Sequence, residues 1–217
     1  MNCAHRAGEL GIFSTMHERG QEILQELLEG NERFRHGEGR AHVYSPDELR
    51  SIASVQRPIA AIVACSDSRI APEIVFDQPL GAIFASRVPG NVASDSAKWM
   101  LEIALGEFQV PLVMVMGHTG CLAIGQLLDG DKGGAGGLHR FSVLSSVYRA
   151  KLRRPEDLYV AAVEENVLQT VEHLARDLYP LRKALLSQST SIVGAVYEME
   201  TGNVRPIPTT VELYGVY

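Results

Sequence analysis

The sequence predicts an α/β fold in which a mostly parallel β-sheet is flanked by helices and preceded by N-terminal helical arms. Apolar, β-branched runs of strand length alternate along the chain with segments whose apolar residues recur every three or four positions. Such alternation is typical of a parallel sheet covered on both faces. The chain has 217 residues, of which 46% are hydrophobic, enough for one packed core. We therefore expect a loose N-terminal arm at residues 1–16 and a single domain over residues 17–217.

The expected elements follow from these patterns in order. Short apolar runs predict strands at 59–64, 82–86, 112–116 and 191–197, and a turn at 201–203 leads into a short return. Helical spacing predicts helices at 17–35, 95–108, 121–128 and 155–178, with one helical turn at 72–76. Ser45 followed by Pro46 and Glu48 reads as a capping box, so a helix is expected from 46 to 56. The glycine-rich stretch 130–137 is expected to be a loop.

Composition excludes several classes of function. The net charge of −6 argues against nucleic acid as a partner, because phosphate binding draws on a concentrated basic surface. The longest apolar runs, 59–65 and 110–116, are far shorter than the ~20 residues of a membrane span, so no membrane association is expected. Three cysteines, at positions 3, 65 and 121, do not form a secreted disulfide framework. A reducing, cytoplasmic location is therefore expected.

Two reactive clusters directly follow predicted strands. The first is Cys65-Ser66-Asp67-Ser68-Arg69, and the second is Gly117-His118-Thr119-Gly120-Cys121. Ligands of open α/β sheets collect at the carboxyl ends of strands. If the two strands are neighbours, two thiols and one imidazole converge there, and these are ligands that tetrahedral zinc prefers. The sequence therefore predicts a zinc site formed by Cys65, His118 and Cys121. Cys3 lies in neither cluster and is not a predicted ligand.

Three protein ligands leave a fourth position, as catalytic zinc sites do. Asp67 is the nearest candidate for that position, and Arg69 can pair with Asp67 as a bidentate fork. Either Asp67 is bound to Arg69 and the metal is open, or Asp67 is a ligand and the site is closed. A phosphatase-like cysteine loop is disfavoured, because it needs Cys and Arg about six residues apart and Cys65 and Arg69 are four apart.

These motifs resemble the zinc and dyad signature of the β-class carbonic anhydrases. Cys65-Ser66-Asp67-Ser68-Arg69 together with His118-x-x-Cys121 carries the likeness. Further segments that resemble the family are 30–34, 56–58, 72–77, 87–91 and 193–202, so the resemblance spans residues 20–207.

The resemblance implies a β-carbonic anhydrase-like fold with one Zn²⁺ per subunit and a homodimer or dimer of dimers. Active sites would lie at the dimer interface, where N-terminal helices embrace the partner. It assigns Cys65, His118 and Cys121 as zinc ligands and Asp67 with Arg69 as the catalytic dyad. It also assigns to the substrate pocket Gln56, reaching in from the neighbouring subunit, the wall residue Phe84, Gly120, and Leu122, which stands where the family has glycine or alanine.

The implied activity is the reversible hydration of CO2 to bicarbonate and a proton, by attack of a zinc-bound hydroxide oriented by Asp67. One alternative is a hydrolase of carbonyl sulfide or carbon disulfide on the same zinc site, and another is a non-catalytic zinc protein. Some family members move Asp67 onto zinc when bicarbonate binds between a tryptophan and an arginine. Here Arg87 matches the arginine, but Ile62 replaces the tryptophan, so we expect Asp67 to stay on Arg69 and that switch to be weak or absent.

Overall fold

The computed structural model describes residues 16–130, 133–135 and 137–209. Within this part of the chain the sheet has five strands in the order β2-β1-β3-β4-β5. These are β1 (Ala60–Ala64), β2 (Ile83–Arg87), β3 (Leu112–His118), β4 (Ser191–Glu198) and β5 (Asn203–Ile207). The first four strands pair in parallel, and β5 returns antiparallel to β4. The predicted α/β fold with a mostly parallel sheet is therefore confirmed.

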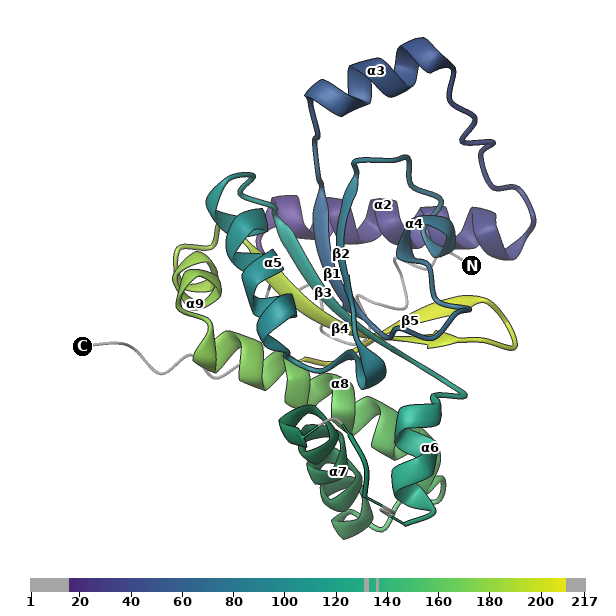
Figure 1. Ribbon diagram of the computed structural model, residues 1–217, viewed down its shortest axis with the longest axis vertical. Coiled ribbons are helices and arrows are strands. Elements are labelled where there is room, and N and C mark those ends of the chain that lie inside the picture. The colour runs from purple at the N-terminus through teal and green to yellow at the C-terminus, as the bar shows by residue number, and fades with distance from the viewer. Residues whose placement is uncertain (1–15, 131–132, 136, 210–217) are drawn as a thin grey trace.

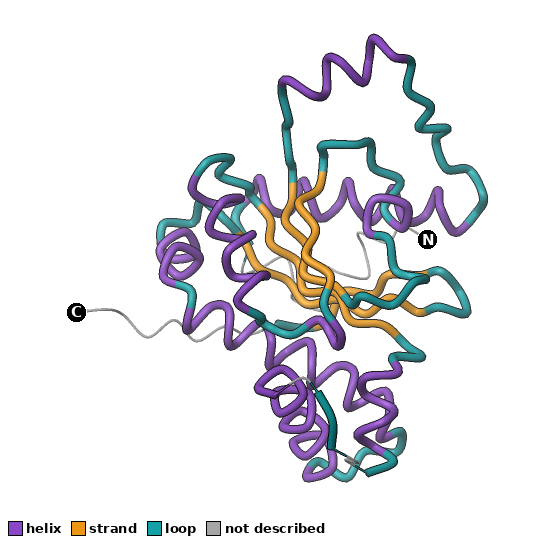
Figure 2. The backbone as a smooth tube through the Cα atoms, in the orientation of Figure 1, coloured by secondary structure: helices purple, strands orange, loops and turns teal. Residues whose placement is uncertain are grey.

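Helices cover both faces of this sheet, as Figures 1 and 2 show. Their bounds are α2 (Glu18–Arg35), α3 (Pro46–Ser54), α4 (Pro72–Val75), α5 (Asp95–Gly106), α6 (Leu122–Leu128), α7 (Gly137–Leu152), α8 (Leu158–Asp177) and α9 (Tyr179–Leu186), with a 3-10 turn at Pro89–Asn91. The predicted start of the long helix at residue 155 is wrong. The helix begins at Leu158, because the side chain of Asp157 accepts the free N–H groups of its first turn and caps it.

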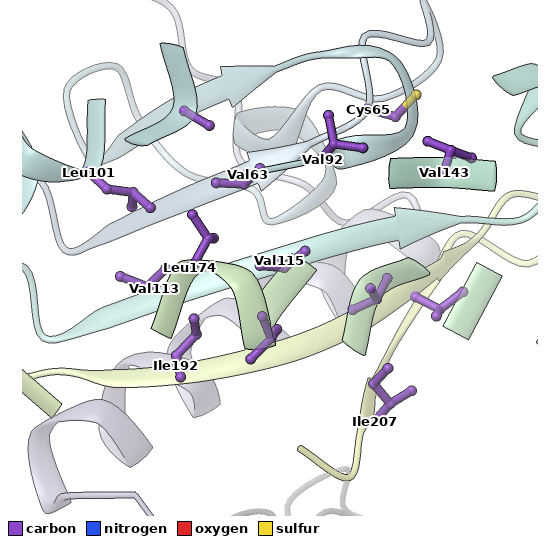
Figure 3. Close-up of a cluster of buried hydrophobic side chains, with 14 of the residues drawn as sticks. Val63, Cys65, Val92, Leu101, Val113, Val115, Val143, Leu174, Ile192 and Ile207 are labelled. Carbon is purple, nitrogen blue, oxygen red and sulfur yellow. The ribbon is translucent and has the colours of Figure 1, made fainter. Parts of the chain in front are cut away.

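The two faces of the sheet carry separate apolar cores. Val63, Val113 and Val115 pack against α5 and α8 on one face (Figure 3), and Ile62, Leu112 and Met114 pack against α2 on the other. Every residue of β1 and β3 is buried. This double burial is why these strands read as continuous apolar runs and not as alternating ones.

Most of the arm expected at residues 1–16 lies outside the described residues. Met16 is described, and its side chain is buried in the core beside α2. Cys3 also lies outside the described residues. None of the described helices combines the length and the apolar composition that crossing a bilayer would require.

The helix α3 stands away from the rest of the chain (Figure 1). Its capping box forms as predicted: the side chain of Ser45 accepts the N–H of Glu48, while Glu48 accepts the N–H of Ser45. Within the described part of the chain no residue of α3 is buried, and the apolar side chains of Leu49 and Val55 at this end are exposed. We call residues 36–45 the linker. From here on, the arm means helix α3 and not the N-terminal arm expected at residues 1–16.

Helix α2 passes so close to the end of α4 that only glycine fits at position 30. A Cβ at Gly30 would overlap the carbonyl oxygen of Phe76. We expect Gly30→Ala to lower the free energy of unfolding by about 1–3 kcal/mol in guanidinium titrations, because the backbone of Phe76 has to move. Gly106→Ala at the end of α5, where an added Cβ meets nothing within 4 Å, is the matched control and should not destabilise the protein. A Gly30→Ala protein as stable as the wild type would contradict the close approach.

Candidate metal centre and active site

The two reactive clusters meet at one edge of the sheet. Strands β1 and β3 are parallel neighbours with Ala64 opposite Met116, so the residues that follow them emerge side by side. Cys65 lies at the end of the strand that carries Val63, as Figure 3 shows. The Sγ atoms of Cys65 and Cys121 are 4.0 Å apart. These atoms and a ring nitrogen of His118 all lie within 4.8 Å of one another, and all three residues are buried.

The donor set fits a tetrahedral zinc ion. Two thiolates at the usual Zn–S length of ~2.3 Å lie about 3.8 Å apart across a tetrahedron, close to the 4.0 Å between the two sulfurs. The Nδ1 atom of His118 lies 2.8 Å from the carbonyl oxygen of Thr119 and donates to it in the tautomer that leaves Nε2 as an acceptor. That Nε2 atom is buried and has no hydrogen-bond partner among the described residues. A buried nitrogen with a free lone pair facing two thiols is what a metal ligand set requires.

The electrostatics of the two thiols are coupled. A hydrogen bond from Cys121 lowers the pKa of Cys65 to about 4. The same hydrogen bond, together with burial, raises the pKa of Cys121. Without metal the pair therefore holds one proton at neutral pH, and a divalent cation that displaces this proton gains two thiolate ligands.

Asp67 and Arg69 form a bidentate pair beside this Cys-His-Cys group. The guanidinium of Arg69 donates from Nε to Oδ1 of Asp67 at 2.9 Å and from Nη2 to Oδ2 at 2.8 Å. The backbone N–H of Arg69 also donates to Oδ1, at 3.0 Å. These hydrogen bonds from Arg69 hold the pKa of Asp67 well below its usual range. Asp67 is thus an ionised acceptor held in place by Arg69.

Gly120 links the dyad to the second cluster. Its φ of +70° lies in the left-handed region that favours glycine, and its carbonyl oxygen accepts a hydrogen bond from Arg69 at 3.3 Å. Leu122, which directly follows Cys121, is the first residue of α6 and is 71% exposed. Leu122 therefore lies at the surface next to Cys121 and is not part of the apolar core.

Two further residues support the site: Arg87, which the sequence indicated only as the match to the family's arginine, and Tyr159, which no sequence motif indicated. Arg87 donates to the carbonyl oxygens of Cys65 and Asp67, at 3.2 and 2.5 Å, and so braces the loop that carries the dyad. The hydroxyl of Tyr159 on α8 donates to the carbonyl oxygen of Cys121 at 3.2 Å, while burial raises the pKa of Tyr159 to about 12 and keeps it a donor. Tyr159 lies 38 positions from Cys121, and no local pattern marks it.

Gln56 and Phe84 do not reach this centre within one chain. Phe84 pairs with Ala61, four residues before Cys65, which places it about 13 Å back along the strands. Its ring packs on that of Phe108, with centroids 5.3 Å apart. Gln56 precedes β1 and is exposed. Both residues therefore lie toward the amino edge of the sheet, whereas the cysteines lie at the carboxyl edge.

Ile62, which replaces the tryptophan of some β-class enzymes, is fully buried on the face of the sheet that α2 covers. The guanidinium of Arg87, its expected companion, donates to the backbone of Cys65 and Asp67. We therefore predict that the bicarbonate switch through Asp67 is weak or absent.

Comparison with known proteins agrees with this site. A family model described as carbonic anhydrase matches residues 60–204, a range that contains both clusters. "Carbonic anhydrase 2" of Mycobacterium tuberculosis H37Rv is 34% identical over 182 residues, which cover 81% of this chain and 87% of that protein. A carbonic anhydrase of Mycolicibacterium smegmatis is 30% identical over 187 residues, covering 82% of this chain and 89% of its own.

Solved structures give the same result. The β-carbonic anhydrase CcaA superposes with a TM-score of 0.64 at 26% identity, over 85% of this chain and 87% of its own. A tetrameric β-carbonic anhydrase from Sordaria macrospora shares the fold with a TM-score of 0.68 at 20% identity, over 75% of this chain and 86% of its own. With the family model, the named relatives and this fold in agreement, the chain belongs to the β-class carbonic anhydrase family.

Proposed function

We propose that the protein catalyses the reversible hydration of CO2 to bicarbonate and a proton, with one Zn²⁺ per subunit held by Cys65, His118 and Cys121. The observation that carries this proposal is the buried Cys-His-Cys group beside an ionised aspartate. The relatives named carbonic anhydrase support it. We also propose a cytoplasmic location, because a reducing compartment keeps the free thiols of Cys65 and Cys121 from forming a disulfide.

Cys65, His118 and Cys121 would hold the zinc ion, which when bound would lower the pKa of a coordinated water and so supply a hydroxide nucleophile near neutral pH. The carboxylate of Asp67 would accept a hydrogen bond from the nucleophilic oxygen and so orient that oxygen toward CO2. Arg69 holds Asp67 in that orientation through two side-chain hydrogen bonds. Because Arg69 keeps the pKa of Asp67 low, Asp67 orients the nucleophile and does not store the released proton.

A homodimer, or a dimer of dimers, would complete the site. Gln56 and Phe84 lie at the edge of the sheet opposite to their own metal centre, and the arm next to Gln56 contributes no buried residue within the described part of its chain. A second copy related by two-fold symmetry can bring these residues to the metal centre of the first. The Sordaria macrospora enzymes with the same fold are described as tetrameric, in keeping with such assembly.

Stopped-flow CO2 hydration measured against pH, with the zinc content of the same preparation, tests the activity. We expect about one zinc per subunit and hydration that rises with pH as the nucleophile is deprotonated. Carbonyl sulfide hydrolysis on that preparation tests the alternative substrate class. A zinc-loaded protein that hydrolyses carbonyl sulfide but does not accelerate CO2 hydration would refute the proposal.

Mixed dimers test whether Gln56 acts across the interface. We expect Gln56→Ala homodimers to lose at least about tenfold in CO2 hydration, and Cys65→Ser homodimers to be inactive. A mixed dimer of the two variants should regain about half of the wild-type rate, because one of its two sites has all its ligands and a partner glutamine. Coexpression with two affinity tags yields this species. A mixed dimer no more active than Gln56→Ala alone would show that Gln56 does not act across the interface.

A further inference from the structure

The arm depends on a few contacts for its placement. No residue of α3 is buried in the described part of the chain, so apolar packing within the subunit does not fix it. The linker, residues 36–45, is exposed along its length except at Tyr44. A cavity of about 400 Å³ lies between the linker and the body, with Phe34, Tyr44 and Ile74 among the residues that line it. Hydrogen bonds therefore have to hold the linker in place.

Asp77 is the partner of two linker residues. Its side chain is only 3% exposed, and Oδ2 accepts a hydrogen bond from Nε of Arg33 on α2 at 2.6 Å. Oδ1 faces the linker, where it accepts the backbone N–H of Arg40 at 2.8 Å and contacts Nε2 of His42 at 3.2 Å. One carboxylate thus joins the body of the subunit to the linker.

The charge of Asp77 makes this joint strong. Burial opposes ionisation, but the hydrogen bonds from Arg33 and from the backbone of Arg40 outweigh it and lower the pKa of Asp77 below its usual value. A buried carboxylate that loses its donors is costly. Movement of the linker away from Asp77 would remove the backbone N–H of Arg40 and the ring of His42 from the carboxylate, so the ionised carboxylate holds the linker against the body.

A second joint follows three residues later. The N–H of Leu80 donates to the hydroxyl of Tyr44 at 2.7 Å, at the end of the linker. A Cβ built at Gly81 would lie 3.9 Å from a methyl carbon of Ile52 and 4.0 Å from Cβ of Gln56. The short segment 77–81 therefore holds the linker at Asp77 and Leu80, and at Gly81 it passes close to Ile52 of the arm and to Gln56.

We propose that Asp77 is a positioning residue of this enzyme: it fixes the linker and the arm so that Gln56 is presented to the active site of the partner subunit. The proposal rests on the proposed function only for the role of Gln56. The attachment of the linker to Asp77 stands on the contacts within one chain.

Hydrogen exchange of the dimer tests the attachment without reference to catalysis. His42→Ala removes a linker contact and leaves Arg33 with Asp77, and Asp77→Asn removes the charge at a position, φ +49°, that asparagine tolerates. We expect either change to speed exchange of the amides of residues 40–56 by about tenfold. Asp177→Asn, which breaks an exposed pair with Arg176, is the matched control and should leave these amides unchanged. Unchanged exchange in both His42→Ala and Asp77→Asn would overturn the proposal.

A double-mutant cycle tests whether Asp77 acts through Gln56. We expect Asp77→Asn to lower kcat/KM for CO2 hydration by about tenfold, and Gln56→Ala with Asp77→Asn to be no slower than Gln56→Ala alone. Losses that multiply would show that Asp77 acts by another route and would overturn its positioning role. A wild-type protein without CO2 hydration would refute the proposed function, while the exchange result would still decide the attachment.

Discussion

Replacing Cys65 by serine is expected to leave the protein folded but without its zinc ion and without measurable CO2 hydration. A serine hydroxyl stays protonated at neutral pH and is a poor ligand for zinc beside Cys121 and His118. Structural and catalytic zinc sites in this coordination class depend on thiolate donors. We expect a loss of at least about 1,000-fold in kcat/KM, since the nucleophile itself is supplied by the metal.

Zinc content after dialysis, circular dichroism and stopped-flow hydration together measure this result. Cys3→Ser is the matched control. Cys3 is not among the predicted zinc ligands, so this substitution should leave zinc content and activity unchanged. A Cys65→Ser protein that keeps one zinc per subunit and wild-type activity would remove Cys65 from the ligand set.

The second large effect is expected at Asp67. Asparagine has nearly the same shape as aspartate, but its amide nitrogen is a donor where the carboxylate accepted a hydrogen bond. Asp67→Asn should therefore lower kcat by about 100- to 1,000-fold while zinc stays bound, because the attacking oxygen is no longer oriented. Stopped-flow hydration and zinc content on one preparation measure both quantities.

Arg69 offers a companion test. Arg69→Ala leaves the carboxylate in place without its two side-chain hydrogen bonds, so it should slow the reaction less than Asp67→Asn does. Asp95→Asn, in the exposed first turn of α5, is the matched control for the change of aspartate to asparagine. If Asp67→Asn were as fast as the wild type, Asp67 would have no part in orienting the nucleophile.

The parts of the fold that sequence could predict are those encoded by local patterns. The buried strands β1 and β3 are continuous apolar runs, and a reactive cluster ends each run, so their convergence needed only that the strands be neighbours. The helix α7 has no such pattern. It buries Val143 and Val147 but exposes Leu138, Phe141, Tyr148 and Leu152, so apolar residues occur all around it and no amphipathic period is visible.

The supporting contacts of the site depend on tertiary packing. Arg87 reaches the carbonyl of Cys65 across 22 positions, and Tyr159 reaches that of Cys121 across 38. Each contact ends on a backbone oxygen, which any residue type supplies, so the sequence carries no complementary signal. The same holds for Asp77, whose linker partner is the backbone N–H of Arg40.

The separation of Gln56 from its own metal centre has a kinetic consequence. If Gln56 acts across the subunit interface as proposed, the number of complete sites would follow the mass action of subunit association, because Cys65 follows β1 at one edge of the sheet and Gln56 precedes it at the other. On dilution below the dimer dissociation constant, subunits would keep their zinc but lose the glutamine that reaches in from outside. Specific activity would then fall as the protein is diluted, at constant metal content. The turnover of each subunit would therefore depend on the concentration of the enzyme as well as on that of its substrate.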